Sequence, residues 1–309
     1  MSSRMQSLFY ELRTAFLPAS LLAVFVGTAL AFYRTGRWHW PLFIACVGGV
    51  GAIHAGANVL NDYCDHLGGS DAANTEFARP FTGGSRLIQQ GRLTPREVRA
   101  FGLMLLAVGV AIGLSLVWWC GMGVLAFLVP AILVAAAYSV PRIGLAARGL
   151  GEVAVALAFG VLGVTGSYFV QTGHISAEAF FVSLPLAVLV GAVLFINQFQ
   201  DYAADRATGK RNWVVRLGRQ RASRVYTCIL TLGVMLPASE AVVGLAPVPL
   251  AWATGSAIFA VPAILCARQH FDDPARLTPA NVFTIVTHTV VAIIAGGALV
   301  VARVTGYVQ

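Results

Sequence analysis

The chain has 309 residues, of which 58% are hydrophobic and only 11% are charged, and its mean hydropathy is +0.76. This composition excludes a soluble globular protein and predicts a polytopic α-helical membrane protein, with residues 1–309 forming a single domain. The net charge of +8 does not indicate nucleic-acid binding, because no basic region has a soluble fold around it. The five cysteines are scattered and lack a CxxC pair, so neither a disulfide framework nor a zinc site is predicted.

Nine apolar runs of about 20 residues follow one another along the chain and predict nine transmembrane helices. The first run is too long for a cleaved signal peptide and has no clear cleavage site, so we expect it to be retained. The third and fourth runs touch, which requires a very tight turn near residues 121–123. Two long connections, about 61–100 and 198–224, are expected to be functional loops. The runs are roughly 15–33, 41–60, 101–120, 121–138, 152–170, 179–197, 225–246, 250–266 and 282–301.

The basic residues indicate how these helices are oriented. With the N-terminus in the cytoplasm, all but three of the 21 Lys and Arg residues fall on the cytoplasmic side. Only Arg34, Arg37 and Arg303 lie outside, which is the asymmetry that the positive-inside rule describes. We therefore expect a multi-pass protein of the cell membrane whose two long connections face the cytoplasm.

The first polar cluster, HAGANVLNDYCDHLGGSD, occupies residues 54–71 at the end of the second run. Spacings of four, three and four residues place four of its side chains on one helix face: His54, Asn58, Asn61 and Asp65. Asp62 is one residue round from that face, and Asp71 follows the helix. One alternative is a solvated helix end on which Asn and Asp serve as caps. For His54 we favour a hydrogen-bonded packing role.

The second polar cluster, NQFQDYAAD, occupies residues 197–205, where Asn197, Asp201 and Asp205 are again four residues apart. Two facing helices would present carboxylates and amides to a central cavity. Carboxylates at the end of a membrane helix are costly unless a cation is present. Mg²⁺ prefers oxygen ligands and bridges to phosphates, so the pair of clusters predicts a metal-bridged diphosphate site.

Basic residues beside the two clusters are suited to phosphate. In ARPFTGGSRLIQQGRLTP (residues 78–95), Arg79 and Arg86 flank a Gly-Gly pair, and arginine forks and glycine amides both bind phosphate oxygens. The alternative is a surface loop that meets anionic lipid headgroups. Lys210 is the only lysine of the chain and lies beside the second cluster, so we favour phosphate contact over a compositional accident.

NDYCD at residues 61–65 and DYAAD at residues 201–205 resemble the paired aspartate-rich motifs of the UbiA superfamily of intramembrane prenyltransferases. The resemblance extends over most of the chain. Within the superfamily, RGLGE and GKRNWVVRLG (residues 148–152 and 209–218) are most similar to the MenA-like branch, which acts on 1,4-dihydroxy-2-naphthoate in menaquinone synthesis. Gly69 stands where the 4-hydroxybenzoate branch usually has Asp. The chain departs from the family at Gln200, where a basic residue is common, and at Asn212 and Trp213, where Thr-Leu is frequent. The further similar segments are residues 12–32, 81–95 and 138–152.

This resemblance implies an intramembrane helix bundle that transfers a polyprenyl group by Mg²⁺-dependent ionisation of a prenyl diphosphate. The allylic cation is then attacked by an aromatic ring carbon, and the naphthoate loses its carboxylate. The implied metal ligands are Asn61, Asp62, Asp65, Asp201 and Asp205, and the four aspartates among them are the catalytic set. The implied substrate contacts are Asn58, Asn61, Asp71, Arg86, Tyr138, Asn197 and Lys210. Tyr138 is equally suited to be an anchor at the membrane interface.

Three other functions are left open by the residues. The acceptor could be 4-hydroxybenzoate or another ring compound. The carboxylates could line the path of a transporter or cation channel, although such residues are expected near the bilayer midplane rather than at helix ends. The protein could also be a catalytically silent lipid-binding scaffold.

Overall fold

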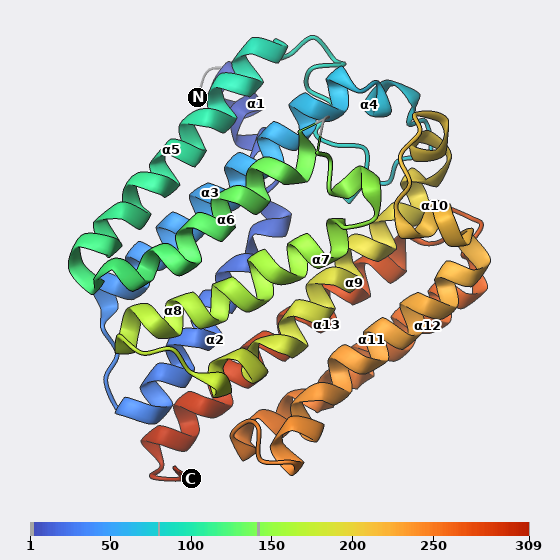
Figure 1. Cartoon of the computed structure of the whole chain (residues 1–309). Coiled ribbons are helices and arrows are strands. Elements are labelled where there is room, and N and C mark those ends of the chain that lie inside the picture. The colour runs from blue at the N-terminus through green and yellow to red at the C-terminus, as the bar shows by residue number, and fades with distance from the viewer. Residues whose placement is uncertain (1–2, 80, 141–142, 309) are drawn as a thin grey trace.

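The computed structural model of the chain describes residues 3–79, 81–140 and 143–308, and Figure 1 labels its elements. No β-strand occurs in these residues, which confirms the predicted all-α fold. Pro80, Pro141 and Arg142, which belong to segments used in the predictions above, lie outside the described residues. The α-helices are α1 (Ser3–Glu11), α2 (Leu17–Thr35), α3 (Trp40–Leu67), α4 (Ser70–Ala73), α5 (Pro95–Cys120), α6 (Leu125–Ser139), α7 (Gly151–Val155), α8 (Gly163–Thr172), α9 (Ala177–Ala207), α10 (Trp213–Leu217), α11 (Arg219–Val242), α12 (Ala257–Gln269) and α13 (Thr278–Val304).

Nine helical segments of the described residues are long and apolar enough to cross a membrane, which confirms the predicted number of spans. Several of them combine more than one element, among them the fifth and the eighth. A π-helical stretch, Ala156–Leu162, joins α7 to α8, and a 3₁₀ stretch, Val248–Ser256, precedes α12. The tight turn between the third and fourth spans is confirmed at Gly121, whose φ of 93° is a conformation that glycine adopts at little cost.

The connection predicted over 198–224 is wrong, because most of it is helical. α9 continues to Ala207, and only residues 208–212 separate it from α10. The last turns of α9 are rich in Ala and Gln and contain no Gly or Pro, so the helix continues beyond the point at which hydropathy falls. The other connection is also shorter than expected, because α3 ends at Leu67 and α5 begins at Pro95. Both acidic motifs therefore lie on helices and not on loops.

The bundle is organised around α9, whose most apolar stretch is the most buried of the nine. In Figure 1, the helices lie side by side, with α4 and α10 at one end of the bundle and the C-terminus at the other. The acidic motifs lie at the end that carries α4 and α10 (Figure 1). On the outside, large apolar side chains such as Leu114, Ile258 and Val301 are exposed, as expected of a surface that faces lipid.

Close helix packing depends on glycine where the π-helical stretch meets α9. A Cβ added at Gly160 would lie 2.3 Å from the Cα of Ala187, so α9 leaves no room for a side chain there. We expect Gly160→Ala to cost about 1–3 kcal/mol and to lower the apparent Tm in detergent by several degrees. Gly297→Ala on α13 is the matched control, because no atom lies within 4 Å of its Cβ. Equal Tm values for the two variants would contradict this packing.

Candidate diphosphate site

A cavity of about 310 Å³ lies among α3, α5, α6, α8 and α9. Most of its wall is apolar, formed by side chains such as Ile53, Leu116, Phe127, Leu162 and Val190. Its polar part is formed by the two acidic motifs. The predicted site residues that line it are Asn58, Asn61, Asp65, Asp71, Tyr138, Asn197, Asp201, Asp205 and Lys210. A cavity with this division suits a molecule that has a charged head and an apolar tail.

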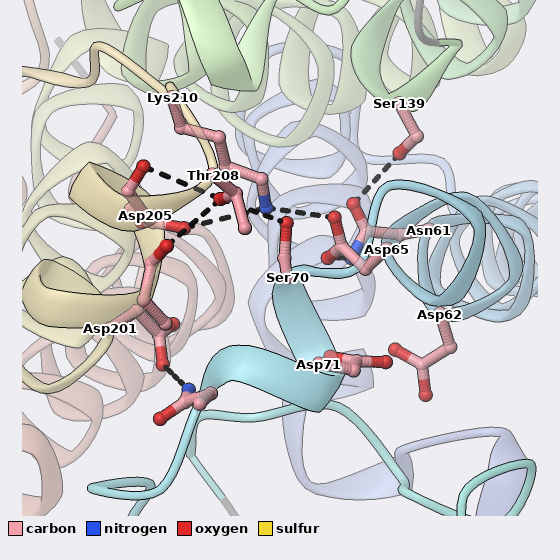
Figure 2. A network of polar contacts seen from close by, with 12 residues as sticks. Asn61, Asp62, Asp65, Ser70, Asp71, Ser139, Asp201, Asp205, Thr208 and Lys210 are labelled. Carbon is pink, nitrogen blue, oxygen red and sulfur yellow. Dashed lines mark hydrogen bonds and ion pairs between the residues drawn. The ribbon is translucent and has the colours of Figure 1, made fainter.

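On α3, the Asp65 carboxylate is held by its neighbour one turn earlier. The Asn61 side chain donates to Asp65 Oδ2 at 2.9 Å and accepts from the Ser139 hydroxyl of α6 at 2.8 Å (Figure 2). Because both ends of the Asn61 amide are bonded, its rotamer is fixed, and the Asp65 carboxylate is directed toward the cavity. The spacing of four residues thus works as the sequence predicted.

On α9, each carboxylate is held by an amide from a following or distant segment. Asn74 donates to Asp201 Oδ1 at 2.6 Å, and Asn212 donates to Asp205 Oδ2 at 2.7 Å. The Asn212 oxygen also caps α10 by accepting from the Val215 amide at 2.9 Å. The amides orient both carboxylates while adding no charge, so the negative potential of the site is kept.

Lys210 bridges the two motifs. Its Nζ lies 2.8 Å from Asp65 Oδ1 on α3 and 3.5 Å from Asp205 Oδ1 on α9 (Figure 2). Burial lowers the pKa of Lys210, but the charges of Asp65 and Asp205 outweigh it, and the net result is a pKa above the usual lysine value. The ammonium group therefore stays charged, and it lies where the carboxylates of Asp65 and Asp205 approach each other.

Asp71 adds a further carboxylate beside the first motif. Gln89 donates to its Oδ2 at 3.1 Å. Burial, together with the charges of Asp62 and Asp65, raises the pKa of Asp71 to about 8. This excess of buried negative charge would be relieved by an added cation, which would lower that pKa.

Asp62 and Arg86 do not line the cavity but secure the loop beside it. Asp62 is buried, accepts from the Ser85 amide at 2.7 Å and lies 3.4 Å from the Arg13 guanidinium. Figure 2 shows its carboxylate beside that of Asp71 and apart from the contacts that Lys210 makes. The Arg86 guanidinium donates to the carbonyl oxygens of Asp71 and Asn74 at 2.8 and 3.1 Å. Their roles in binding metal and phosphate stay predictions.

The Gly-Gly pair of this loop is required by both conformation and space. Gly84 has a φ of 66°, and a Cβ there would lie 3.1 Å from Asp62 Oδ1 and 3.3 Å from Asp71 Oδ1. We expect Gly84→Ala to displace the loop and reduce enzymatic turnover about tenfold. Gly91→Ala is the control, because its φ is 68° but no atom lies within 4 Å. Steady-state rates of both variants test this. An equal loss of rate in both would mean that the positive φ, and not the close contact with Asp62 and Asp71, limits residue 84 to glycine.

The donor set fits a hard divalent cation that is completed by other ligands. Among the described residues, no three His, Cys, Asp or Glu side chains come together closely enough to hold a metal ion by themselves. Mg²⁺ usually binds one or two carboxylates and keeps sites for water and substrate phosphate. The carboxylates that already converge on the Lys210 ammonium meet that requirement.

The comparison with known proteins identifies the family. Residues 20–288 match the UbiA prenyltransferase family. The chain belongs to this family. Among curated UbiA-type relatives, it is 33% identical to the 1,4-dihydroxy-2-naphthoate octaprenyltransferase of Haemophilus influenzae, over 69% of this chain and 70% of the relative. It is 31% identical to the enzyme of the same name from Escherichia coli, over 74% of each chain.

A solved structure of the UbiA family has the same fold. It is a UbiA homolog from Archaeoglobus fulgidus bound to DMAPP and Mg²⁺, with a TM-score of 0.67. The match covers 96% of this chain and 99% of that chain at 16% sequence identity, so it establishes the arrangement of helices. The predicted resemblance is confirmed, and the protein is a multi-pass membrane prenyltransferase.

In this UbiA-family bundle, several predicted residues are occupied in packing. His54 is hydrogen-bonded to Ser20 at 2.8 Å and stacked on Phe159, with 4.1 Å between ring centroids, which is the packing role that we favoured. Asn197 accepts from Asn281 of α13 at 2.7 Å. Tyr138 lines the cavity, as a contact for a ring or cation would.

The sequence did not single out four residues that support or line the site: Asn74, Ser139, Gln198 and Asn212. Asn74 and Asn212 lay in segments interpreted as loops, and Ser139 directly follows the run at residues 121–138, which was interpreted only as a span. Their one available signal was polarity in a charge-poor chain. That signal gives no partner, because Asn74, Ser139 and Asn212 each bond to a residue of another segment.

Proposed function

We propose that this protein transfers a polyprenyl group from a prenyl diphosphate to 1,4-dihydroxy-2-naphthoate, with loss of the carboxylate, in menaquinone synthesis. One observation carries the proposal: carboxylates from two facing helices converge on one cation at the polar end of an apolar cavity. The names of the Haemophilus influenzae and Escherichia coli relatives support the choice of acceptor.

Four residues would hold the metal and the diphosphate: Asn61, Asp65, Asp201 and Asp205. Mg²⁺, when bound, would neutralise the diphosphate and make it a better leaving group. Lys210 would exchange its contacts with the carboxylates for phosphate oxygens, since an ammonium on a flexible stem suits both. Asp62 would act in support by holding the loop of residues 81–86 over the site through the Ser85 amide.

The reaction needs an environment without water. When the carbon–oxygen bond breaks, the electron pair leaves with the diphosphate and an allylic cation remains. The apolar wall of the cavity would hold the polyprenyl tail and keep water from that cation. The ring carbon that bears the carboxylate then supplies the electron pair for the new carbon–carbon bond. The bond from the ring to the carboxylate breaks, its electron pair returns to the ring, and carbon dioxide is released as the ring regains aromaticity.

Turnover of labelled substrate tests the function. The purified protein is incubated with Mg²⁺, a labelled prenyl diphosphate and a panel of aromatic acceptors that includes 1,4-dihydroxy-2-naphthoate and 4-hydroxybenzoate. We expect a prenylated naphthoquinol and one equivalent of carbon dioxide. Product from 4-hydroxybenzoate alone would overturn the assignment of 1,4-dihydroxy-2-naphthoate as the acceptor. Ion flux in liposomes without product from any acceptor would overturn the reaction and favour a channel.

We also propose that the N-terminus and the site face the cytoplasm of the cell membrane. The distribution of Arg and Lys supports this orientation, because in the part of the chain that the structure describes only Arg34, Arg37 and Arg303 lie at the opposite end. An N-terminal tag should be cleaved by added protease only after the cells are opened. Cleavage on intact spheroplasts would reverse the orientation.

A further inference from the structure

Two amide side chains face the cavity below the carboxylates. Asn58 precedes Asp65 by seven residues on α3, and Gln198 precedes Asp205 by seven residues on α9. Seven residues make two helical turns, so each amide lies on the face of its carboxylate and about 10 Å further along the helix. Both amides line the cavity. They form a second polar level between the charged end and the apolar wall.

Each of these amides has a buried atom without a protein partner. Within the described residues, no hydrogen bond reaches Asn58 Nδ2 or Gln198 Oε1, and Gln198 is only 7% exposed. The neighbouring amides of Asn61, Asn74 and Asn212 are all bonded to protein groups. Because buried polar groups are nearly always paired, one donor and one acceptor left open on facing helices indicate a polar ligand between them.

The orientation of Gln198 has a structural cause. Glu152 of α7 lies near the Gln198 side chain, and neither of its carboxylate oxygens has a hydrogen-bond partner among the described residues. A carboxylate can only accept hydrogen bonds, so the NH₂ group of Gln198 is the end that suits Glu152. The Gln198 oxygen is then left for the cavity.

We propose that Asn58 and Gln198 form the subsite that orients the aromatic acceptor. Asn58 Nδ2 donates to an oxygen of the acceptor, and Gln198 Oε1 accepts from a ring hydroxyl. This inference rests on the proposed function. The attacked carbon is bonded to the diphosphate at the polar end, and a ring carbon must approach to about 3–3.5 Å, so the ring belongs at the level just below the carboxylates. A ring hydroxyl that donates a hydrogen bond to Gln198 also raises the electron density at the ring carbon that attacks.

The subsite predicts which acceptors are rejected. An acceptor whose hydroxyls are methylated leaves the Gln198 oxygen unpaired in a closed cavity. A site built to bind a hydroxyl discriminates strongly against an analogue that lacks one. We expect the unmodified naphthoquinol to be preferred over its O-methyl ethers by at least about tenfold in kcat/KM.

The test compares KM for the two substrates in Gln198→Met and Asn58→Leu, which keep the size of the side chain but remove its hydrogen-bonding groups. We expect KM for the naphthoate to rise about tenfold or more, while KM for the prenyl diphosphate and the Mg²⁺ dependence stay near those of the unmodified protein. Gln171→Met is the control, because its amide bonds to the His39 backbone at the other end of the bundle. It should leave both KM values unchanged.

A second measurement does not depend on how much of a variant is folded. The ratio of kcat/KM for the naphthoquinol and its O-methyl ether is determined on one preparation, and Gln198→Met should bring it close to one. A normal ratio in Gln198→Met, or an equal rise of both KM values in both variants, would overturn the subsite. If the unmodified protein prenylates no acceptor, the proposed function itself fails, which is a different result.

Discussion

Asp65→Asn is expected to reduce the single-turnover rate of prenyl transfer by about 10³-fold or more while leaving the protein folded. The change keeps the shape of the side chain but removes one of the two carboxylate charges that meet Lys210, at 2.8 Å from Asp65 and 3.5 Å from Asp205. Asp205→Asn should have a similar effect. Rates are measured with labelled prenyl diphosphate at several Mg²⁺ concentrations.

Glu178→Gln is the control that makes the same chemical change elsewhere. Glu178 pairs with Arg34 at the other end of the bundle, at 2.8 Å, and should be dispensable for turnover. Its rate should match that of the unmodified protein. Near-normal rates for Asp65→Asn across all Mg²⁺ concentrations would remove Asp65 from the diphosphate site.

Periodicity predicted the parts of the site that depend on a single helix. Spacings of three and four residues placed Asn61 and Asp65 on one face of α3, and Asp201 and Asp205 on one face of α9, and all four line the cavity. Hydropathy predicted the nine spans. These features were accessible because the geometry of a helix fixes neighbours three and four residues apart.

Partners from distant segments could not be predicted in the same way. Asp62 and Asp65 both belong to the first motif, but only Asp65 lines the cavity, because the Asp62 carboxylate is bonded to the Ser85 amide and paired with Arg13. Arg86 has the charge that phosphate needs, yet its guanidinium lies over the Phe77 ring at 4.4 Å and bonds to backbone carbonyls. Such contacts depend on how a loop returns to the helices.

Lys210→Met is expected to lower kcat/KM for the prenyl diphosphate by about 10²-fold, because the substrate loses a charge-assisted contact to its leaving oxygens. It should also make the protein without Mg²⁺ less stable, since Asp65 and Asp205 then face each other without their ammonium partner. In the unmodified protein, the raised pKa of Lys210 determines how stability depends on pH. The charged form is favoured by folding, so its contribution to stability is complete below the usual lysine pKa and is lost only as the pH rises through the higher folded value.

The two roles of Lys210 are separated by adding Mg²⁺ without substrate. If the ammonium stands where the metal binds, the apparent Tm of Lys210→Met should rise more on Mg²⁺ addition than that of the unmodified protein, because the metal no longer competes with Lys210 for the carboxylates. Arg206→Met removes an exposed cation next to Asp205 and should change neither the Tm response nor the rate by much. An identical response to Mg²⁺ in Lys210→Met and the unmodified protein would mean that the metal does not bind between Asp65 and Asp205. In that case Lys210 holds α3 and α9 together without sharing their carboxylates with a metal.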